Sequence, residues 1–191
     1  KSDYYNQQNA RCCYCSTTLV PHKATYDLEH ILAKSNHPKF MFELRNLAAA
    51  CKLCNGAKDD AEVLSDQGSQ KIGGCFPAGS QDYEIVHPHF DAWGDYFRFD
   101  QFNRVVPRDV KAYYTFRLCQ MQRVNVARLA DNFGGKYREA AENYLMAFFV
   151  QEDPAKKQRY IDLLETIVED GGLEKARYLL AVLNSEMAKE K

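Results

Sequence analysis

The sequence lacks the features that mark membrane proteins, secreted proteins and strongly basic nucleic-acid binders. No apolar run approaches the roughly 18 residues of a membrane span, and no signal peptide is recognisable. Positive charge is not in excess, because 25 Lys and Arg stand against 26 Asp and Glu, a formal net charge of −1. Seven cysteines without a secretory signal are typical of thiols in a reducing compartment. We therefore expect a cytoplasmic protein with no membrane partner, and weak retention of nucleic acid by charge alone.

The pattern of the sequence changes twice along the 191 residues. Residues 1–10 are polar, and we expect them to be loosely held. Cysteine pairs and short apolar pieces alternate between residues 11 and 60, whereas residues 66–80 are rich in Gly, Ser and Gln, as in a connecting loop. Three further segments resemble short strands: 83–86, 96–99 and 104–106.

From Arg108 onward the periodicity becomes helical. A first stripe of apolar residues comprises Val110, Tyr113, Tyr114, Leu118, Met121 and Val124. The later stripes are Tyr137, Ala141, Tyr144 and Phe148, then Tyr160, Leu163, Leu164 and Ile167, then Leu173, Ala176, Leu180, Leu183 and Met187. Asp153-Pro154 is a helix-start signal, and Gly171-Gly172 is a helix-stop signal. This pattern predicts a small helical bundle.

Two cysteine pairs predict a metal site in the first 60 residues. Cys12 and Cys15, like Cys51 and Cys54, are separated by two residues, a spacing that presents both thiolates to one ion. Two such pairs complete a tetrahedral zinc site, which we call the zinc staple. The alternatives are a set of buried free thiols, or Cys13 as a ligand in the first pair. The remaining cysteines, Cys75 and Cys119, have no partner in sequence and are expected to be buried thiols.

The 35 residues between the two pairs carry a second motif. It consists of Glu29-His30-Ile31, Lys34-Ser35 and Asn46-Leu47, and it ends in Cys54-Asn55-Gly56-Ala57-Lys58. Together with the cysteines, this arrangement resembles the HNH (ββα-metal) nuclease family in its zinc-stapled form, over about residues 11–60. It departs from the family at Ala33, where proline is usual, and Glu29 stands where many relatives have aspartate. The resemblance implies a zinc-stapled nuclease core in residues 1–65. The residue pattern adds loop and short strands in 66–107 and a helical bundle in 108–191, so we expect an α+β fold.

Hydrolysis of a phosphodiester requires a base for the attacking water and a cation near the phosphate. His30 is suited to be the base, because imidazole titrates near neutral pH. Glu29 and Asn55 offer hard oxygen ligands for a catalytic Mg²⁺ or Mn²⁺. Since neighbouring strand residues point to opposite sides, Glu29 and His30 need a twist or bulge to converge. By the resemblance, Asn46 fixes the loop that carries His30 and Lys58 contacts a phosphate; the alternatives are a turn asparagine and a solvated lysine.

The other histidines have simpler interpretations. His22 and His37 each lie beside a proline and are interpreted as loop residues. His87, His89 and Asp91 could form a second metal site, but a turn whose imidazoles hydrogen-bond to backbone is favoured. The following aromatic residues could stack on bases, although alternation makes several of them core: Tyr83, Phe90, Trp93, Tyr96, Phe97, Phe99 and Phe102.

A narrower resemblance concerns the order of EHILAKS, NLAAACKLCNGAK and HPHFDAWGDYF. This order looks like the small HNH component of Septu-type bacterial anti-phage defence systems. The resemblance implies a nuclease that acts on DNA, with tRNA or other RNA as alternatives, beside an ABC-like ATPase partner. An acidic segment in residues 61–106, with seven Asp and Glu against three Lys and Arg, also favours substrate delivery by a partner. Some of the surplus apolar residues in 107–191 could form the interface, although packing between the helices is the first explanation for them: Phe148, Phe149, Tyr178 and Leu179.

Two non-enzymatic interpretations remain open at this point. The chain could be a catalytically inactive, zinc-stapled nucleic-acid-binding or adaptor module. It could also be a structural protein that joins an assembly through its helices, with zinc only as a staple. Intact Glu29, His30 and Asn55 favour the enzyme.

Overall fold

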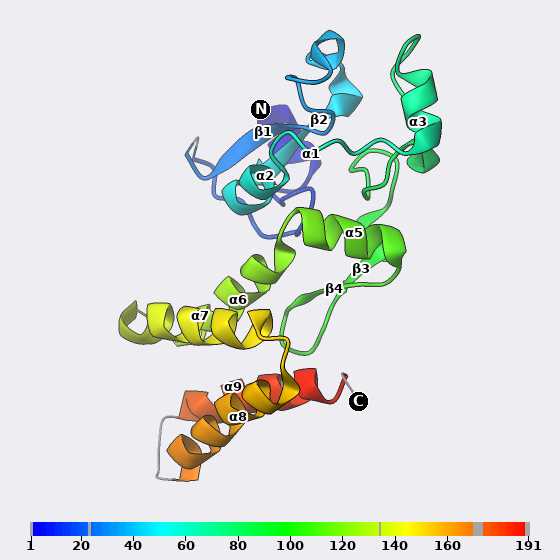
Figure 1. Cartoon of the computed structure of the whole chain (residues 1–191). Coiled ribbons are helices and arrows are strands. Elements are labelled where there is room, and N and C mark those ends of the chain that lie inside the picture. Colours follow the sequence, from blue (N-terminus) through cyan, green and yellow to red (C-terminus); the bar gives the residue numbers. More distant parts are fainter. Residues whose placement is uncertain (1, 23, 134, 170–173, 190–191) are drawn as a thin grey trace. The chain divides into compact units, whose positions relative to one another are not determined.

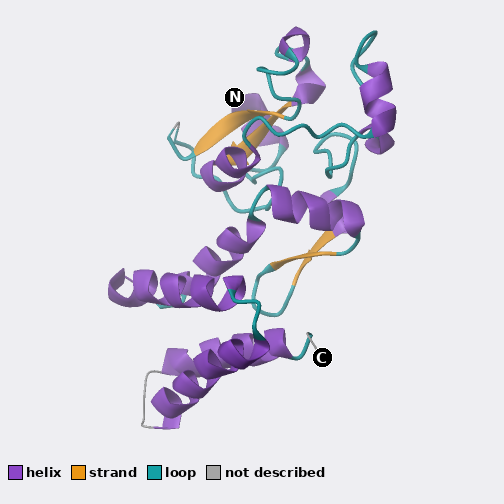
Figure 2. Cartoon of the chain, in the orientation of Figure 1, coloured by secondary structure: helices purple, strands orange, loops and turns teal. Residues whose placement is uncertain are grey.

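A computed structural model describes residues 2–22, 24–133, 135–169 and 174–189 of the chain (Figure 1). The chain divides into two compact units. Unit 1 comprises Lys1–Asp100 and Val105–Val124, and unit 2 comprises Gln101–Arg104 and Asn125–Lys191. Helices and small antiparallel sheets occur together, which is an α+β composition (Figure 2). None of the helices in the described residues combines the length and the hydrophobicity that a membrane span requires.

Unit 1 is built around a two-stranded antiparallel sheet. Its strands are β1 (Tyr26–His30) and β2 (Leu47–Cys51), with Glu29 opposite Ala48 and His30 opposite Leu47. Helix α2 (Lys52–Lys58) follows β2 directly. The other regular elements of unit 1 are α1 (Ser2–Gln7), α3 (Asp66–Lys71), α4 (Trp93–Tyr96), β3 (Phe97–Phe99), β4 (Val105–Pro107) and α5 (Val110–Leu118). Strands β3 and β4 pair antiparallel, so two of the three predicted short strands are present as a pair.

Small side chains on β2 allow close packing in the core of unit 1. Ala48, Ala49 and Ala50 are all fully buried, as are Ile31 and Leu32 just after β1. Burial on both faces of a strand requires an unbroken apolar run, which the segment Leu47–Cys51 supplies. This packing holds the end of β1 and the start of α2 in place.

Two segments expected to be loose or irregular are helical. The prediction that residues 1–10 are loosely held was wrong: they include α1, and Gln8 exchanges two side-chain hydrogen bonds with the backbone of Ala49, at 2.7 and 2.9 Å. Residues 66–80 were predicted as a loop, yet they begin with α3. The Ser65 hydroxyl accepts a hydrogen bond from the Gly68 nitrogen at 3.2 Å, a capping contact that satisfies a free donor at the helix start.

The prediction of one continuous helix from the first apolar stripe was only partly correct. Its helix is interrupted at Gln120, whose positive φ of 46° separates α5 from α6 (Met121–Asp131). The turn allows Cys119 and Met121 to be fully buried in the core of unit 1. Val110 is instead 85% exposed, and the buried face of α5 carries Ala112 and Thr115. Tyr113 and Tyr114 are exposed as well.

Unit 2 contains the remaining helices, α7 (Gly135–Val150), α8 (Pro154–Glu169) and α9 (Glu174–Met187), with most of α6. The predicted start of α8 is confirmed, because the Asp153 carboxylate accepts a hydrogen bond from the Ala155 nitrogen at 2.9 Å. Leu173 and the stop signal Gly171-Gly172 lie outside the described residues. The core of unit 2 contains Val126, Leu129, Leu145, Phe148, Ile161, Leu164, Ala176, Leu179, Val182 and Leu183.

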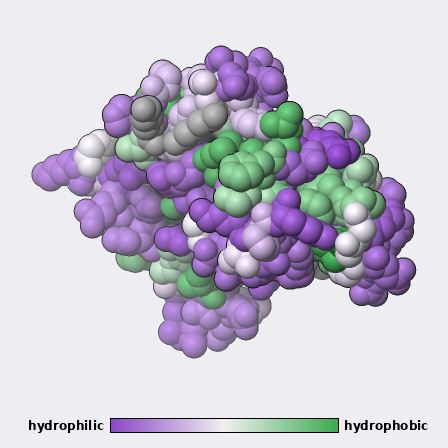
Figure 3. Space-filling model, turned by 90° about the horizontal axis from the view of Figure 1, so that it is seen from above, coloured by the Kyte–Doolittle hydropathy of each residue, from purple (hydrophilic) through white to green (hydrophobic). Residues whose placement is uncertain are grey.

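The four residues named as possible interface contacts pack in or against this core, as the helix-packing explanation predicts. Phe148 and Leu179 are buried, and Phe149 and Tyr178 pack against the same cluster. Among the described residues of unit 2, the exposed large hydrophobic residues are different ones: Tyr137, Val150, Leu163 and Ile167. The face of the molecule drawn in Figure 3 is hydrophilic over most of its area, with hydrophobic residues gathered in smaller patches.

Candidate functional site

The four cysteines predicted from their spacing come together in unit 1. The sulfurs of Cys12, Cys15, Cys51 and Cys54 all lie within 4.8 Å of one another, and those of Cys15 and Cys51 are 3.8 Å apart. Four thiolates bound tetrahedrally at about 2.3 Å from zinc would have sulfurs about 3.8 Å apart. The donor set therefore fits a zinc ion, and the cluster could hold one.

The protonation of these thiols reflects their crowding. Hydrogen bonding from Cys12, and then from Cys51 and Cys54, holds the pKa of Cys15 well below its ordinary value. The pKa of Cys12 is raised, chiefly by burial, and the pKa values of Cys51 and Cys54 are raised, chiefly by their hydrogen bonds with Cys12. Three thiols thus stabilise one thiolate, whereas a divalent cation would stabilise all four.

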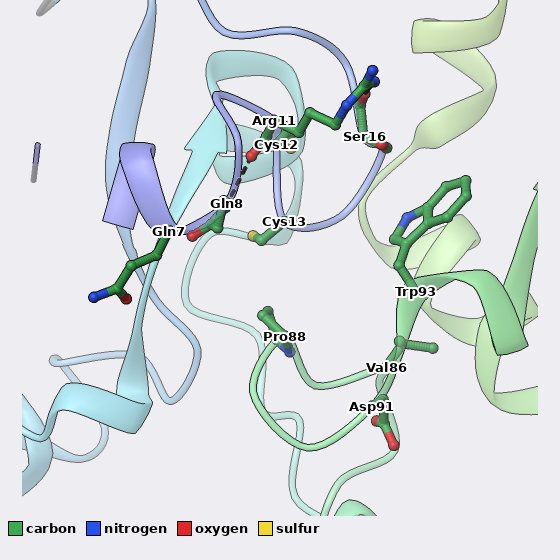
Figure 4. Close-up of a pocket in the computed structure, with 10 residues that line it drawn as sticks. All are labelled: Gln7, Gln8, Arg11, Cys12, Cys13, Ser16, Val86, Pro88, Asp91 and Trp93. Atoms are coloured by element: carbon green, nitrogen blue, oxygen red, sulfur yellow. Dashed lines mark hydrogen bonds between the residues drawn. The ribbon is translucent and has the colours of Figure 1, made fainter. Parts of the chain in front are cut away.

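The other cysteines lie outside the cluster. Cys13 lines a cavity of about 280 Å³, together with the cluster residue Cys12, Pro88 and Trp93 (Figure 4). Cys119 is buried as expected, but Cys75 is exposed, so the prediction of a buried thiol was wrong there. Cys75 follows the turn at Gly73 and Gly74, where little of the chain packs over it.

A second, polar cavity is lined by three of the candidate catalytic residues. It has a volume of about 260 Å³. Its lining combines the end of β1 and the loop after it with α2 and the turn that follows: Leu28, Glu29, His30, Ala33, Lys34, Ser35, Asn55, Gly56, Asp59 and Asp60. Glu29, His30 and Asn55 therefore line one cavity, although they come from two different elements.

His30 is the last residue of β1 and is partly exposed. Its Nε2 lies 3.2 Å from the carbonyl oxygen of Met41. Partial burial lowers the pKa of His30, against the opposing effect of the Met41 carbonyl. The neutral, proton-accepting form is therefore favoured near neutral pH.

Glu29 is almost completely buried, with 3% of its surface exposed. Its Oε1 accepts a hydrogen bond from the Tyr14 hydroxyl at 3.1 Å and lies 2.9 Å from the Lys58 Nζ. Burial raises the pKa of Glu29, and Lys58 and Tyr14 act in the opposite direction. Both contacts involve Oε1, so Oε2 is the oxygen of this cavity-lining residue that is left for another ligand.

Lys58 is buried next to two residues that line the cavity, Glu29 and His30. Its side chain is fully buried, and its Nζ donates to the His30 carbonyl at 3.1 Å as well as pairing with Glu29. Lys58 is therefore not a solvated lysine, and its ammonium group is engaged by Glu29 and the His30 carbonyl. Because a buried ammonium is costly unless it is paired and hydrogen-bonded, the contacts with β1 account for its location.

Asn55 is held by a residue that the sequence did not single out. Its Nδ2 donates to Asp27 Oδ2 at 3.0 Å, and Lys52 pairs with the other Asp27 oxygen at 2.5 Å. Strand alternation puts Asp27 and Glu29 on the same side of β1, a signal that could have identified Asp27. For Tyr14, nothing in the sequence indicated a contact with Glu29.

Asn46 ties together the loop that follows His30. It is fully buried; its Oδ1 accepts from the Leu32 nitrogen at 2.7 Å, and its Nδ2 donates to the carbonyls of Leu32 and Phe40, each at 3.1 Å. The Asn46 carbonyl accepts from the Ile31 nitrogen at 2.9 Å. These bonds connect residues 31–40 to the start of β2.

The remaining histidines behave as loop and turn residues. His22 is exposed, and His37 Nε2 lies 2.7 Å from Glu62 Oε2. The turn interpretation of His87 and His89 is confirmed: the His89 nitrogen donates to His87 Nδ1 at 3.2 Å, and His89 Nε2 lies 2.8 Å from the Leu47 carbonyl. Asp91 forms an ion pair with Lys111, with 2.8 Å between Asp91 Oδ2 and Lys111 Nζ.

Comparison with known proteins identifies one partial relative. A stretch of 50 residues is 38% identical to a protein of Bacillus thuringiensis. That relative is the Septu protein PtuB. The stretch covers 26% of this chain and 20% of the relative, so the chain matches only a small part of PtuB. A scan with family models finds no match for the chain, and a search of solved structures finds none either.

Proposed function

We propose that this protein is a metal-dependent endonuclease of the HNH type, which hydrolyses phosphodiester bonds of nucleic acid. The observation that carries the proposal is that Glu29, His30 and Asn55 line one polar cavity. The chain order β1, β2, α2, with β1 and α2 lining that cavity and a four-cysteine cluster nearby, supports the assignment of residues 11–60 to a zinc-stapled ββα-metal core.

The residues fit a catalytic divalent cation. The free carboxylate oxygen of Glu29 and the amide oxygen of Asn55 are hard donors of the kind that Mg²⁺ and Mn²⁺ prefer. When bound, such an ion supplies Lewis-acid stabilisation of the phosphate and the departing oxygen. His30 would accept the proton of the attacking water through Nδ1, because its Nε2 faces the Met41 carbonyl. Lys34, which also lines the cavity, could contact a substrate phosphate.

Cleavage of nucleic acid tests the proposal directly. The full chain would be incubated with plasmid, single-stranded DNA and tRNA, with Mg²⁺, with Mn²⁺ and with EDTA. We expect metal-dependent cleavage, with DNA as the preferred substrate, and loss of cleavage in His30→Ala. Binding without cleavage under every metal condition would instead support an inactive nucleic-acid-binding module.

The partial similarity to PtuB supports a role in bacterial anti-phage defence. By the resemblance to Septu systems, we further propose an ABC-like ATPase as partner, bound through the helical part of the chain. Leu163 and Ile167 are exposed, are one turn apart on α8, and are the apolar residues suited to such contact. Co-purification of the full chain with the ATPase should be reduced by Leu163→Glu combined with Ile167→Glu. Undiminished co-purification would exclude this face of α8 as the interface.

A further inference from the structure

We propose that Tyr14 and Lys58 are positioning residues that hold Glu29 for the divalent ion, and that Tyr14 thereby connects the zinc staple to the catalytic cavity. This inference rests on the proposed function. It gives Lys58 a role different from a phosphate contact, and it gives the staple a part in ion binding besides stabilising the fold.

The first support is that both residues contact the same carboxylate oxygen. Tyr14 and Lys58 approach Glu29 Oε1, at 3.1 and 2.9 Å. A carboxylate with one oxygen held in this way can rotate little, so its second oxygen has a defined direction. Hydrogen-bond partners outside the ligand shell commonly orient metal ligands in this manner.

Burial of these residues strengthens the constraint. Tyr14 is 1% exposed and Lys58 is 1% exposed, so water competes little for their contacts with Glu29. Lys58 also donates to the carbonyl of His30. One ammonium group therefore fixes the Glu29 side chain and the backbone of the neighbouring candidate base.

Tyr14 owes its position to the cysteine cluster. It lies between Cys13 and Cys15, inside the first cysteine pair. An ion bound by both Cys12 and Cys15 would therefore fix the backbone that carries Tyr14. The Trp93 indole nitrogen donates to the Tyr14 carbonyl at 2.7 Å, which holds the backbone from another side. A phenol on this rigid turn is thus directed at Glu29.

A purely structural role for Tyr14 is the competing explanation. Tyr83 provides a matched control, because it is also a buried tyrosine of unit 1 and its hydroxyl donates to the Pro77 carbonyl at 2.8 Å. Both Tyr14→Phe and Tyr83→Phe lose one buried hydroxyl bond, so we expect a decrease in thermal stability for each, and that decrease alone does not identify a positioning role. Only the Tyr14 hydroxyl contacts a proposed ligand of the divalent ion.

The experiment measures Mn²⁺ binding to the zinc-loaded full chain, without nucleic acid, by electron paramagnetic resonance of free Mn²⁺. We expect Tyr14→Phe to weaken Mn²⁺ binding at least about tenfold, with zinc content unchanged. Tyr83→Phe should bind Mn²⁺ as tightly as the parent. Equal Mn²⁺ affinity in Tyr14→Phe and the parent would overturn the inference while leaving the nuclease proposal in place. If the parent itself binds no Mn²⁺, the proposed ion site fails, and the inference fails with it.

Lys58 is tested by a pair of substitutions. Lys58→Arg retains a cation beside Glu29, whereas Lys58→Met removes it, so Mn²⁺ affinity should decrease in the order parent, Lys58→Arg, Lys58→Met. Lys157→Met, at a buried lysine in unit 2, controls for the loss of a buried lysine elsewhere. If Lys58→Met does not fold, Lys58→Arg and Tyr14→Phe carry the test. Unchanged Mn²⁺ affinity in a folded Lys58→Met would exclude a positioning role for this lysine.

Discussion

Asn55 Nδ2 donates a hydrogen bond to Asp27 Oδ2, with 3.0 Å between the two atoms. Because an amide has its nitrogen and oxygen on opposite sides, this bond directs the Asn55 oxygen away from Asp27. Asn55 lines the same cavity as Glu29 and His30. Asp27 therefore selects which of the two amide atoms is available to a cation.

Asp27→Ala should weaken the response to the catalytic ion without changing the fold. The Asn55 amide would then be free to turn, and the Mg²⁺ concentration for half-maximal cleavage should increase roughly tenfold. At saturating Mg²⁺ most of the cleavage rate should return. Asp95→Ala, at an exposed aspartate in α4, is the control and should leave the Mg²⁺ dependence unaltered. An unchanged Mg²⁺ dependence in Asp27→Ala would show that Asn55 does not depend on this contact.

His30→Ala should abolish cleavage while the zinc content and the circular dichroism spectrum stay the same. Loss of a general base typically lowers the rate by at least about 10²-fold. Burial lowers the pKa of His30, so the cleavage rate of the parent should fall on acidification only below the ordinary pKa range of an exposed histidine. A variant with parental rates would remove His30 from the role of base.

Removal of a zinc ligand should destabilise unit 1. Such small folds bury too little apolar surface to be stable without their metal. Cys54→Ser should lose zinc, as measured by elemental analysis, and should unfold at lower urea concentration. Cys13→Ser and Cys75→Ser should retain zinc, because neither sulfur belongs to the cluster. If the purified parent protein were folded but contained no zinc, the prediction of a structural zinc site would be wrong.

His87 should make the stability of the protein sensitive to acid. Burial lowers its pKa to about 3, so in the folded state it remains neutral down to that pH. Below the ordinary pKa of about 6.5 the unfolded chain binds a proton that the folded chain does not. The free energy of unfolding should therefore decrease as pH falls from about 6.5 towards 3, by up to about 1.4 kcal/mol per pH unit from this residue.

His87→Phe should reduce this pH dependence, and urea unfolding at several pH values between 4 and 7 measures it. Phenylalanine can keep the stacking on Phe90, whose ring centroid lies 4.2 Å from that of His87. His22→Phe, at an exposed histidine, is the control for replacing a histidine elsewhere in unit 1. Equal slopes in His87→Phe and the parent would mean that His87 is protonated in the folded state.

The sequence alone determined the features that depend on local spacing. The spacing of two residues within each cysteine pair predicted that Cys12, Cys15, Cys51 and Cys54 form one group, and their sulfurs do come together. The start of α8 at Asp153-Pro154 was predictable too, because a helix cap is formed by neighbours in the chain. Glu29, His30 and Asn55 were recognisable as a set only through the resemblance to a family.

Only the tertiary structure decided the contacts between residues far apart in the chain. Lys58 has the sequence context of a solvated lysine at a helix end. Its side chain is nevertheless fully buried against Glu29, which lies on β1, far earlier in the chain. The interruption at Gln120 was equally hidden, because helical periodicity continues across it. In both cases burial in a shared core outweighs the local preference, and burial depends on which distant residues the folded chain brings together.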